Sequence, residues 1–276
     1  MDANELLEVA RAAARDAVAV HRRYLGTVAV AEWSEKGISD FVTHVDREAE
    51  AVIVRRIAAA FPAHEILAEE AATAPGGTGA VVRDAEWLWI VDPLDGTTNF
   101  LHTHPAFSAS VAVAHRGQLE AGVIAHGGTG QVWTAVRGGG AFLDDRPVHV
   151  STVEDLRLAL VGTGFPSKNK HLLPAYLPQL ERVLQHSAGV RREGSAALDL
   201  CHVATGHLDA FWELGLAPWD VAAGMLLIRE AGGVVTDLAG GDPGLGGVPI
   251  LAANALIHAQ LRDLLATLET PGAGAG

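Results

Sequence analysis

The 276-residue sequence is short of cysteine and of charge, and each shortage excludes a class of protein. A single cysteine, Cys201, excludes an internal disulfide framework and is expected in the core. Hydrophobic residues make up 49% and charged residues only 19%, so the chain is globular rather than disordered. No apolar stretch approaches the ~20 residues of a membrane span, and the N-terminal residues do not resemble a signal peptide. These features predict a cytoplasmic protein with no membrane partner.

Basic residues are also scarce: 20 Lys and Arg stand against 33 Asp and Glu, a formal net charge of −13. Nucleic acid is therefore excluded as a main partner, because a phosphate backbone needs a basic surface. A small phosphorylated substrate remains possible if bound cations invert the local charge. The acidic excess is explained either by clusters that bind metal or by ordinary solubility.

The most informative stretch is Trp87–Phe100. Its apolar first part, Trp87–Val91, is rich in aromatic and β-branched residues and predicts a buried strand. We expect the strand to stop at Asp92-Pro93, because proline has no N–H group for a ladder.

The residues that follow this strand suit metal and phosphate binding. Asp92 and Asp95, with the Leu94 carbonyl between them, can converge on one hard cation. Gly96 allows close approach of the backbone, and N–H groups at Gly96 and Thr97 can bind a phosphate if a helical turn begins there. The alternative interpretation is a turn with solvated aspartates.

Three motifs together resemble the inositol monophosphatase family of Mg-dependent, lithium-sensitive phosphatases, and in particular its bacterial type. They are the central Asp92–Phe100, the later Trp219–Gly224 and the acidic Leu67–Glu70, in the order of the family and at its usual intervals. The resemblance extends from roughly Glu5 to Leu268.

The order of the predicted elements indicates stacked α and β layers, an α+β fold. The resemblance implies a five-layer αβαβα sandwich of the inositol monophosphatase and fructose-1,6-bisphosphatase type. It also implies a homodimer. We expect an N-terminal lobe over 1–150 with the metal motifs, a C-terminal lobe over 151–270 that completes the active site, and a flexible tail at 271–276.

Periodicity and capping residues predict the individual elements. Helices are expected over Asn4–Leu25, Asp40–Phe61, Leu173–His186, Gly194–Ala204, Pro218–Ala231 and Asn254–Leu268. Strands are expected over Glu65–Ala68, Trp87–Val91, Arg157–Gly162, Leu208–Glu213, Gly232–Asp237 and Pro249–Ala252, with an antiparallel meander over Phe107–Ala114, Leu119–His126 and Gln131–Ala135.

The resemblance also implies the roles of the site residues. The Mg²⁺ ligands would be Glu69, Asp92, the Leu94 carbonyl, Asp95 and Asp220. Thr97, oriented by Asp46, would act with Glu69 to activate a water that attacks phosphorus in line, without a covalent phosphoenzyme. Read alone, Thr43 and Asp46 are better explained as a helix N-terminal cap, and Asp220 can be explained as another.

Substrate contacts follow from the same likeness. Gly96 and Thr97 would bind the phosphate, and the polyol hydroxyls would meet Asp95, Gly194, Ser195, Ala196, Glu213 and Asp220. Glu213 is equally explained as a solvated strand end. Glu70 is expected behind the ligands rather than among them. Where the family has glycine and a hydroxyl residue around this acidic pair, Ala68 and Ala71 predict weaker hydrogen bonding near Glu69.

Thirteen histidines suggest a competing zinc site, with His102 and His104 the closest pair. A zinc site needs more ligands within reach, so these are interpreted as surface or loop histidines.

Three functions remain. The first is a Mg-dependent phosphatase of inositol monophosphate or a similar small polyol phosphate. The second keeps the chemistry on histidinol phosphate, fructose 1,6-bisphosphate or a 3′-phosphoadenosine nucleotide, although an acidic Glu213 disfavours the nucleotide. The third is a non-catalytic binding or regulatory protein on the same scaffold.

Overall fold

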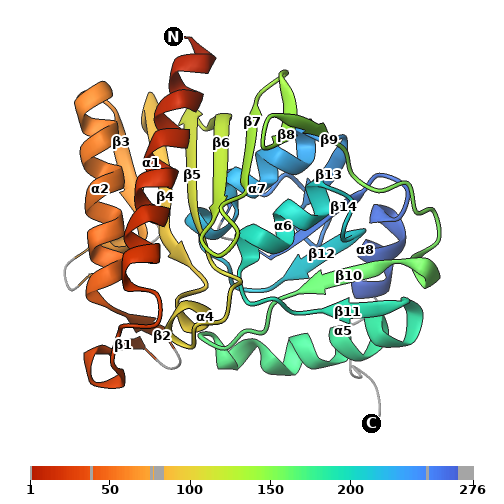
Figure 1. Ribbon diagram of the computed structural model, residues 1–276. Coiled ribbons are helices and arrows are strands. Elements are labelled where there is room, and N and C mark those ends of the chain that lie inside the picture. The colour runs from red at the N-terminus through yellow and green to blue at the C-terminus, as the bar shows by residue number, and fades with distance from the viewer. Residues whose placement is uncertain (1, 38–39, 75–76, 78–83, 247–248, 267–276) are drawn as a thin grey trace.

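The helices and strands stack in five layers (Figure 1). The computed structural model describes residues 2–37, 40–74, 77, 84–246 and 249–266, so the predicted tail at 271–276 lies outside the described residues. From one side to the other, the layers are helices α1 (Ala3–Tyr24) and α2 (His44–Ala60), a seven-stranded sheet, α6 (Ala196–Ala204) and α7 (Pro218–Glu230), a five-stranded sheet, and α5 (Leu173–His186) with α8 (His258–Ala266). This arrangement confirms the predicted αβαβα sandwich.

The first sheet runs in the order β3-β4-β5-β6-β7-β8-β9. Its strands are β3 (Glu65–Ala68), β4 (Trp87–Asp95), β5 (Ser108–His115), β6 (Gln118–His126), β7 (Val132–Val136), β8 (Gly140–Leu143) and β9 (Arg146–Val148). β3 pairs with β4 in parallel, and every later pair is antiparallel, so the predicted meander is confirmed.

The second sheet runs in the order β11-β10-β12-β14-β13. Its strands are β10 (Leu160–Thr163), β11 (Gly189–Arg191), β12 (Ala210–Glu213), β13 (Gly233–Thr236) and β14 (Ile250–Asn254). The short elements are β1 (Ser34–Gly37), β2 (Asp40–Val42), α3 (Glu69–Thr73), α4 (Thr97–Leu101) and 3₁₀ turns at Val30–Glu32, Leu156–Leu158 and Lys170–Leu172.

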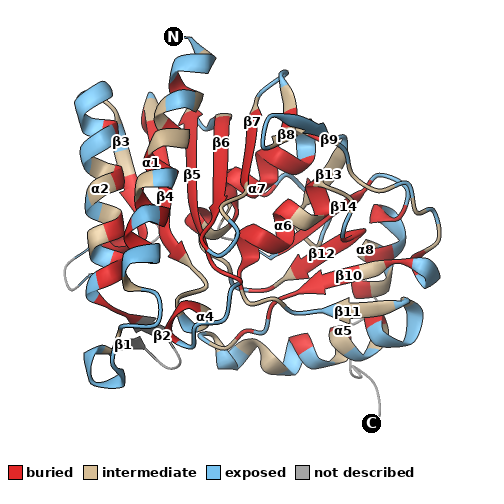
Figure 2. Cartoon of the chain, viewed as in Figure 1, coloured by how far each residue is buried: buried red, intermediate tan, exposed pale blue. Residues whose placement is uncertain are grey.

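Helices cover both faces of the seven-stranded sheet, which explains why the apolar run of β4 is unbroken. Trp89 and Val91 pack with α1 and α2, whereas Leu88 and Ile90 pack with α6 and α7 on the opposite face. Figure 2 shows that the middle strands of this sheet and the helices α6 and α7 are largely buried. Each side chain fully buried in this way stabilises the fold by roughly 1.5–3 kcal/mol. No helix in the described part of the chain is long and apolar enough to cross a membrane.

Two predicted boundaries near the site are wrong. β4 does not stop at Asp92-Pro93 but continues to Asp95, because a bulge between Asp92 and Asp95 accommodates the proline without a ladder hydrogen bond. The second helix begins at His44 rather than Asp40, because Asp40–Val42 pairs with β1 and Thr43 caps the helix.

Three smaller predictions are also wrong. Leu156–Leu158 forms a 3₁₀ turn, so β10 begins at Leu160 and not at Arg157. Strand β11 was not predicted, because three residues are too few for an alternating pattern. Asn254 ends β14 and α8 begins only at His258, because the Asn254 side chain accepts hydrogen bonds from the N–H groups of Leu256 and Ile257.

Candidate active site

The bulge in β4 brings two aspartates to the same side of the sheet. Asp92 is paired with Ser110 and Asp95 with Ser108, so two residues of β4 stand opposite one residue of β5. Residues three apart on a regular strand point to opposite faces, and the extra residue of a bulge removes that difference. The sequence motif therefore works through a backbone irregularity that the strand pattern alone did not predict.

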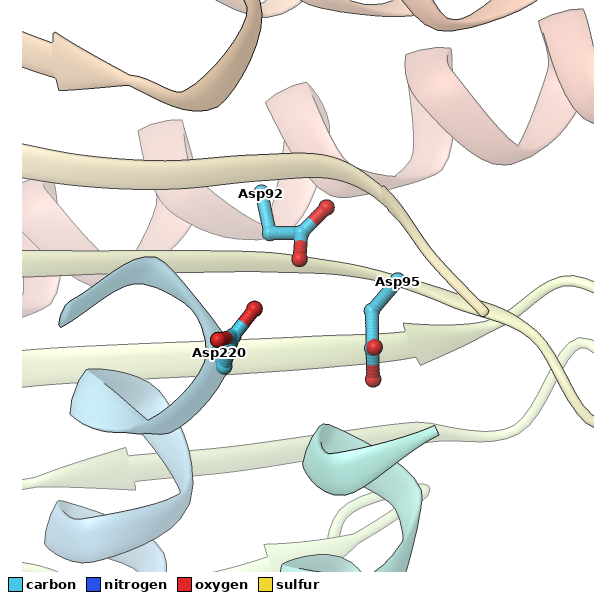
Figure 3. A group of neighbouring side chains, drawn as sticks. All are labelled: Asp92, Asp95 and Asp220. Carbon is cyan, nitrogen blue, oxygen red and sulfur yellow. The ribbon is translucent and has the colours of Figure 1, made fainter. Parts of the chain in front are cut away.

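A third aspartate joins them from a distant part of the chain. Asp220 lies in the first turn of α7, and its Oδ2 accepts a hydrogen bond of 2.6 Å from the Ala217 N–H. Carboxylate oxygens of Asp92, Asp95 and Asp220 all lie within 4.8 Å of one another, and the three side chains converge in Figure 3. Asp220 thus caps its helix and also faces the other carboxylates, so the two interpretations of this residue hold together.

Glu69 borders the same cavity from the first residue of α3. Its Oε1 lies 3.9 Å from the Lys168 ammonium. Glu70 is buried, and it does not border the cavity. The Glu50 carboxylate accepts hydrogen bonds from the N–H groups of Glu70 and Ala71, at 2.7 and 3.0 Å. Glu50 on α2 thereby anchors the start of α3, next to Glu69, where the sequence predicts weaker hydrogen bonding.

Burial and mutual repulsion make these carboxylates costly to ionise. Burial and then Glu69, Asp95 and Asp220 hold the pKa of Asp92 well above its usual range. Burial raises the pKa of Asp95 to about 6, against hydrogen bonds from Ser195 and Ala197 that lower it. Burial likewise raises the pKa of Asp220 to about 7, although the positive charge of Lys168 opposes the shift.

The cluster fits a hard divalent cation. All of its donors are oxygens, the ligand type that Mg²⁺, Ca²⁺ and Mn²⁺ prefer. Two ligands of one octahedral Mg²⁺ lie about 3.0–4.2 Å apart, and the three aspartate oxygens, within 4.8 Å of one another, stand close to that range. A cation would also remove the repulsion that raises these pKa values.

Thr97 connects the cluster to a buried aspartate. Its hydroxyl lies 3.0 Å from Asp46 Oδ1 and 3.0 Å from the Leu94 carbonyl, and its single proton serves one of them at a time. Asp46 Oδ2 accepts hydrogen bonds from the N–H and the hydroxyl of Thr43. One oxygen of Asp46 therefore caps α2 while the other accepts from Thr97. The same side chain thus serves as the helix cap and as the predicted partner of Thr97.

The turn after β4 is shaped for a ligand. Gly96 has φ +86°, and a Cβ there would lie 2.9 Å from the Ala106 carbonyl, so only glycine fits. α4 begins at Thr97, as expected, and the first N–H groups of a helix have no partner inside it.

The second oxygen of Asp95 is held by α6. Asp95 Oδ2 accepts hydrogen bonds from the Ser195 hydroxyl and from the Ala197 N–H, the latter at 2.9 Å. Ser195 also caps α6 by accepting a hydrogen bond from the Leu198 N–H. The structure therefore places Gly194, Ser195 and Ala196 directly beside Asp95 on the wall of the cavity.

Glu213, at the end of β12, also borders the cavity. A Cβ added to Gly164 would overlap its carboxyl group, so the bare backbone of Gly164 provides the space for this side chain. Burial, then Asp220 and Asp95, raises the pKa of Glu213 well above its usual range. Glu213 is accordingly a cavity residue rather than a solvated strand end.

The cavity has a volume of about 410 Å³ and two distinct ends. Its carboxylate end consists of Glu69, Asp92, Asp95 and Asp220. Its loop end consists of residues 164–169, Arg192, residues 194–196 and Glu213. The cavity residues that were not predicted as site residues include Asn99, Lys168, Arg192 and Asp199.

Asn99 is the one for which the sequence held a signal, since it belongs to the central motif. Its side-chain N–H₂ group donates to the Ala106 and Glu193 carbonyls, at 2.7 and 2.8 Å, and so ties α4 to the loop before Gly194. Asp199 is buried on α6, and burial raises its pKa well above the usual range.

The histidine pair does not form a metal centre. The His102 ring packs edge-on against Trp33, and His104 Nδ1 accepts a hydrogen bond from the Ala106 N–H. Within the described residues, the group found able to hold a metal ion contains no histidine.

Comparisons with known proteins agree with this geometry. The model of the inositol monophosphatase family matches residues 2–269. An inositol-1-monophosphatase of Mesorhizobium japonicum is 42% identical over 271 residues, 98% of each chain. A Nus factor SuhB of Pseudomonas aeruginosa is 43% identical over 252 residues, 90% of this chain and 91% of that protein.

Solved structures give the same result. The extragenic suppressor protein SuhB of Bartonella henselae matches with a TM-score of 0.86 and 40% identity, covering 94% of this chain and 98% of that one. An inositol monophosphatase from Anabaena matches with a TM-score of 0.83 and 37% identity over 95% of each chain. The chain therefore belongs to the inositol monophosphatase family.

Proposed function

We propose that this protein is a Mg²⁺-dependent phosphomonoesterase that hydrolyses inositol monophosphate, or a similar small polyol phosphate, to the alcohol and phosphate. The observation that carries the proposal is the carboxylate end of the cavity, where oxygens of the buried Asp92 and the partly buried Asp95 and Asp220 lie within 4.8 Å of one another beside the turn at Gly96. When bound, Mg²⁺ supplies Lewis-acid stabilisation of the phosphate and leaving oxygen and makes a water molecule more acidic.

The chain's own groups would position the reactants. Asp92, Asp95, Asp220, Glu69 and the Leu94 carbonyl would hold the cations. The N–H groups of Gly96 and Thr97 would hold the phosphate.

Thr97 and Glu69 would handle the proton of the attacking water. With its own proton donated to Asp46 Oδ1, the Thr97 oxygen can accept a hydrogen bond from that water. The Leu94 carbonyl is then left for a cation. Glu69, beside the cluster, would accept the proton that the water loses.

The loop end would receive the alcohol. Asp95, held by Ser195 and Ala197, has its other oxygen available to a substrate hydroxyl or a cation. Gly194, Ser195, Ala196 and Glu213 complete this surface. A cavity of about 410 Å³ suits a six-carbon polyol phosphate.

The test is phosphate release with Mg²⁺ from inositol 1-phosphate, histidinol phosphate, fructose 1,6-bisphosphate and 3′-phosphoadenosine 5′-phosphate. We expect the inositol ester to be preferred. Preference for another ester would transfer the same chemistry to that substrate. Absence of release from every ester, together with absence of Mg²⁺ binding, would refute the phosphatase.

The names of several relatives favour a second candidate. Proteins of Pseudomonas aeruginosa and Escherichia coli are named Nus factor SuhB. A non-catalytic role of that kind is distinguished by Asp95→Asn: a variant without phosphatase activity that keeps the full cellular role would favour it over the enzyme.

We further propose, from membership of the family, a cytoplasmic homodimer inhibited by lithium. Light scattering at the mass of one chain would contradict the dimer. Unchanged activity in millimolar lithium would contradict the inhibition.

A further inference from the structure

Two cationic side chains border the loop end of the cavity in a chain whose net charge is −13. Lys168 extends toward Glu69 of the carboxylate end. Arg192 follows β11, and its guanidinium carbon lies 5.2 Å from the centre of the Phe165 ring. Such a cation–π contact holds a guanidinium in place without using its N–H groups.

The backbone makes room for this guanidinium. Gly194 has φ +90°, and a Cβ there would lie 2.5 Å from Arg192 Nη1. The guanidinium therefore passes close to the backbone of Gly194, on the segment that holds Asp95. In the described part of the chain, no hydrogen bond or ion pair of the Arg192 guanidinium is found, so its five N–H donors are directed to solvent or ligand.

Acceptors stand at the same end of the cavity. The Glu213 carboxyl fills the space above Gly164, and Asp199 lies on α6. The positive charge of Arg192 lowers the pKa of both carboxyls, against the larger effect of burial. The guanidinium and both carboxyls therefore border the same cavity.

We propose that Arg192, held by Phe165, is a specificity-determining residue that selects alcohols bearing hydroxyl groups and rejects alcohols bearing an ammonium group. This inference rests on the proposed phosphatase function. A hydroxyl group both accepts and donates hydrogen bonds, so vicinal hydroxyls can pair with the guanidinium and the carboxyl at once. An ammonium has donors only, leaves the guanidinium unpaired and repels it.

The experiment compares steady-state kinetics of the wild type, Arg192→Gln and Arg191→Gln on inositol 1-phosphate and on histidinol phosphate, an amino alcohol ester. Arg191 is the matched control, because it is an exposed neighbour whose guanidinium donates to the Val190 carbonyl and does not border the cavity. Phe165→Ala separately tests the cation–π contact that holds the Arg192 guanidinium in place.

We expect Arg192→Gln to raise KM for the inositol ester about tenfold or more with kcat little changed, the effect of losing hydrogen bonds to a charged group. The ratio of kcat/KM for the inositol ester to that for the amino alcohol ester should fall by the same factor or more. The amino alcohol ester should bind better once the guanidinium no longer repels its ammonium group. Phe165→Ala should give a smaller change in the same direction, and Arg191→Gln none.

Equal changes on both esters, or an Arg191→Gln variant that behaves like Arg192→Gln, would overturn the inference. So would a wild type that prefers the amino alcohol ester. If the wild type releases no phosphate, the phosphatase proposal has failed but both esters become stable ligands. Calorimetric dissociation constants then make the same comparison, with unchanged relative affinities in Arg192→Gln as the contradicting result.

Discussion

The two ends of the cavity are built from different kinds of structure. At the carboxylate end, each aspartate has one oxygen tied to a backbone N–H group, from Leu94, Ala197 and Ala217. The groups come from a strand bulge and from the first turns of helices. At the loop end, Lys168 and Arg192 extend from connecting segments, with Phe165 45% exposed. On the proposed function, the groups for catalysis would therefore lie at strand and helix ends, and those for substrate selectivity on loops.

The largest expected effect of a substitution is at the carboxylate end. Asp92→Asn should lower kcat at least about 10³-fold, equal to ~4 kcal/mol of barrier, because a cation ligand loses its charge. The same change should raise the melting temperature of the metal-free protein, since it removes a charge from a buried cluster whose neighbours repel it. Activity within tenfold of wild type would show that the carboxylate end does not hold the catalytic cation.

Thr97→Ala should have the next largest effect. Loss of the hydroxyl that bonds Asp46 should lower kcat about 10²-fold with KM nearly constant, a typical size for a group that handles a proton. Thr97→Ser should recover most of the activity. Thr98→Ala, on an exposed neighbour, is the control, and a loss of equal size there would contradict the role of Thr97.

At the loop end, Gly164→Ala should change binding rather than chemistry. The added methyl group displaces the Glu213 carboxyl, so KM for the inositol ester should rise about tenfold while kcat changes much less. Glu213→Ala should match it, and the double variant should be no worse than either single variant. Gly189→Ala, where a Cβ meets nothing closer than 3.5 Å, is the control. A fall in kcat with KM unchanged would remove the distinction between the two ends.

The smallest effect is a pH dependence of stabilisation by Mg²⁺. The folded-state pKa values of Asp95 and Asp220 are raised to about 6 and about 7, so their contribution to stability is complete below about pH 4 and is lost as pH rises through those values. A bound cation reverses this loss. The rise in melting temperature caused by Mg²⁺ should therefore be greater near pH 8 than near pH 5. Each kcal/mol of difference in the free energy of unfolding corresponds to about 2–4 °C.

Comparing samples with and without Mg²⁺ at each pH cancels the contributions of other titrating groups to stability. Among these is His21, whose pKa burial lowers to about 4 and whose effect on stability has the opposite sign. Equal increments at both pH values would contradict the prediction.

The carboxylate end could be predicted from sequence because its residues lie in compact motifs with distinctive chemistry. Asp92, Asp95 and Gly96 are adjacent in the chain, and Asp220 follows a tryptophan at a helix start. Even so, the bulge that turns Asp92 and Asp95 to one side was missed, because a proline after an apolar run indicates only a strand end.

The loop end could not be predicted in the same way. Lys168 and Arg192 are ordinary charged residues in sequence, and only the packing of Phe165, the open backbone of Gly194 and the unpredicted β11 bring Arg192 to the cavity. The aspartates near helix starts were ambiguous in sequence for another reason, because a cap and a site residue look alike. Asp46 and Asp220 each fitted two roles in sequence, and the structure uses a separate oxygen of Asp46 for each role.

The central claim is that Asp92, Asp95 and Asp220 hold divalent cations, and anomalous scattering from crystals soaked in Mn²⁺ tests it most directly. The account predicts at least one anomalous peak within bonding distance of these carboxylates, at about 2.2 Å. The same peak should be absent or weaker in Asp92→Asn. A cavity without an anomalous peak, or peaks at the histidines instead, would contradict the claim that these aspartates hold the cations.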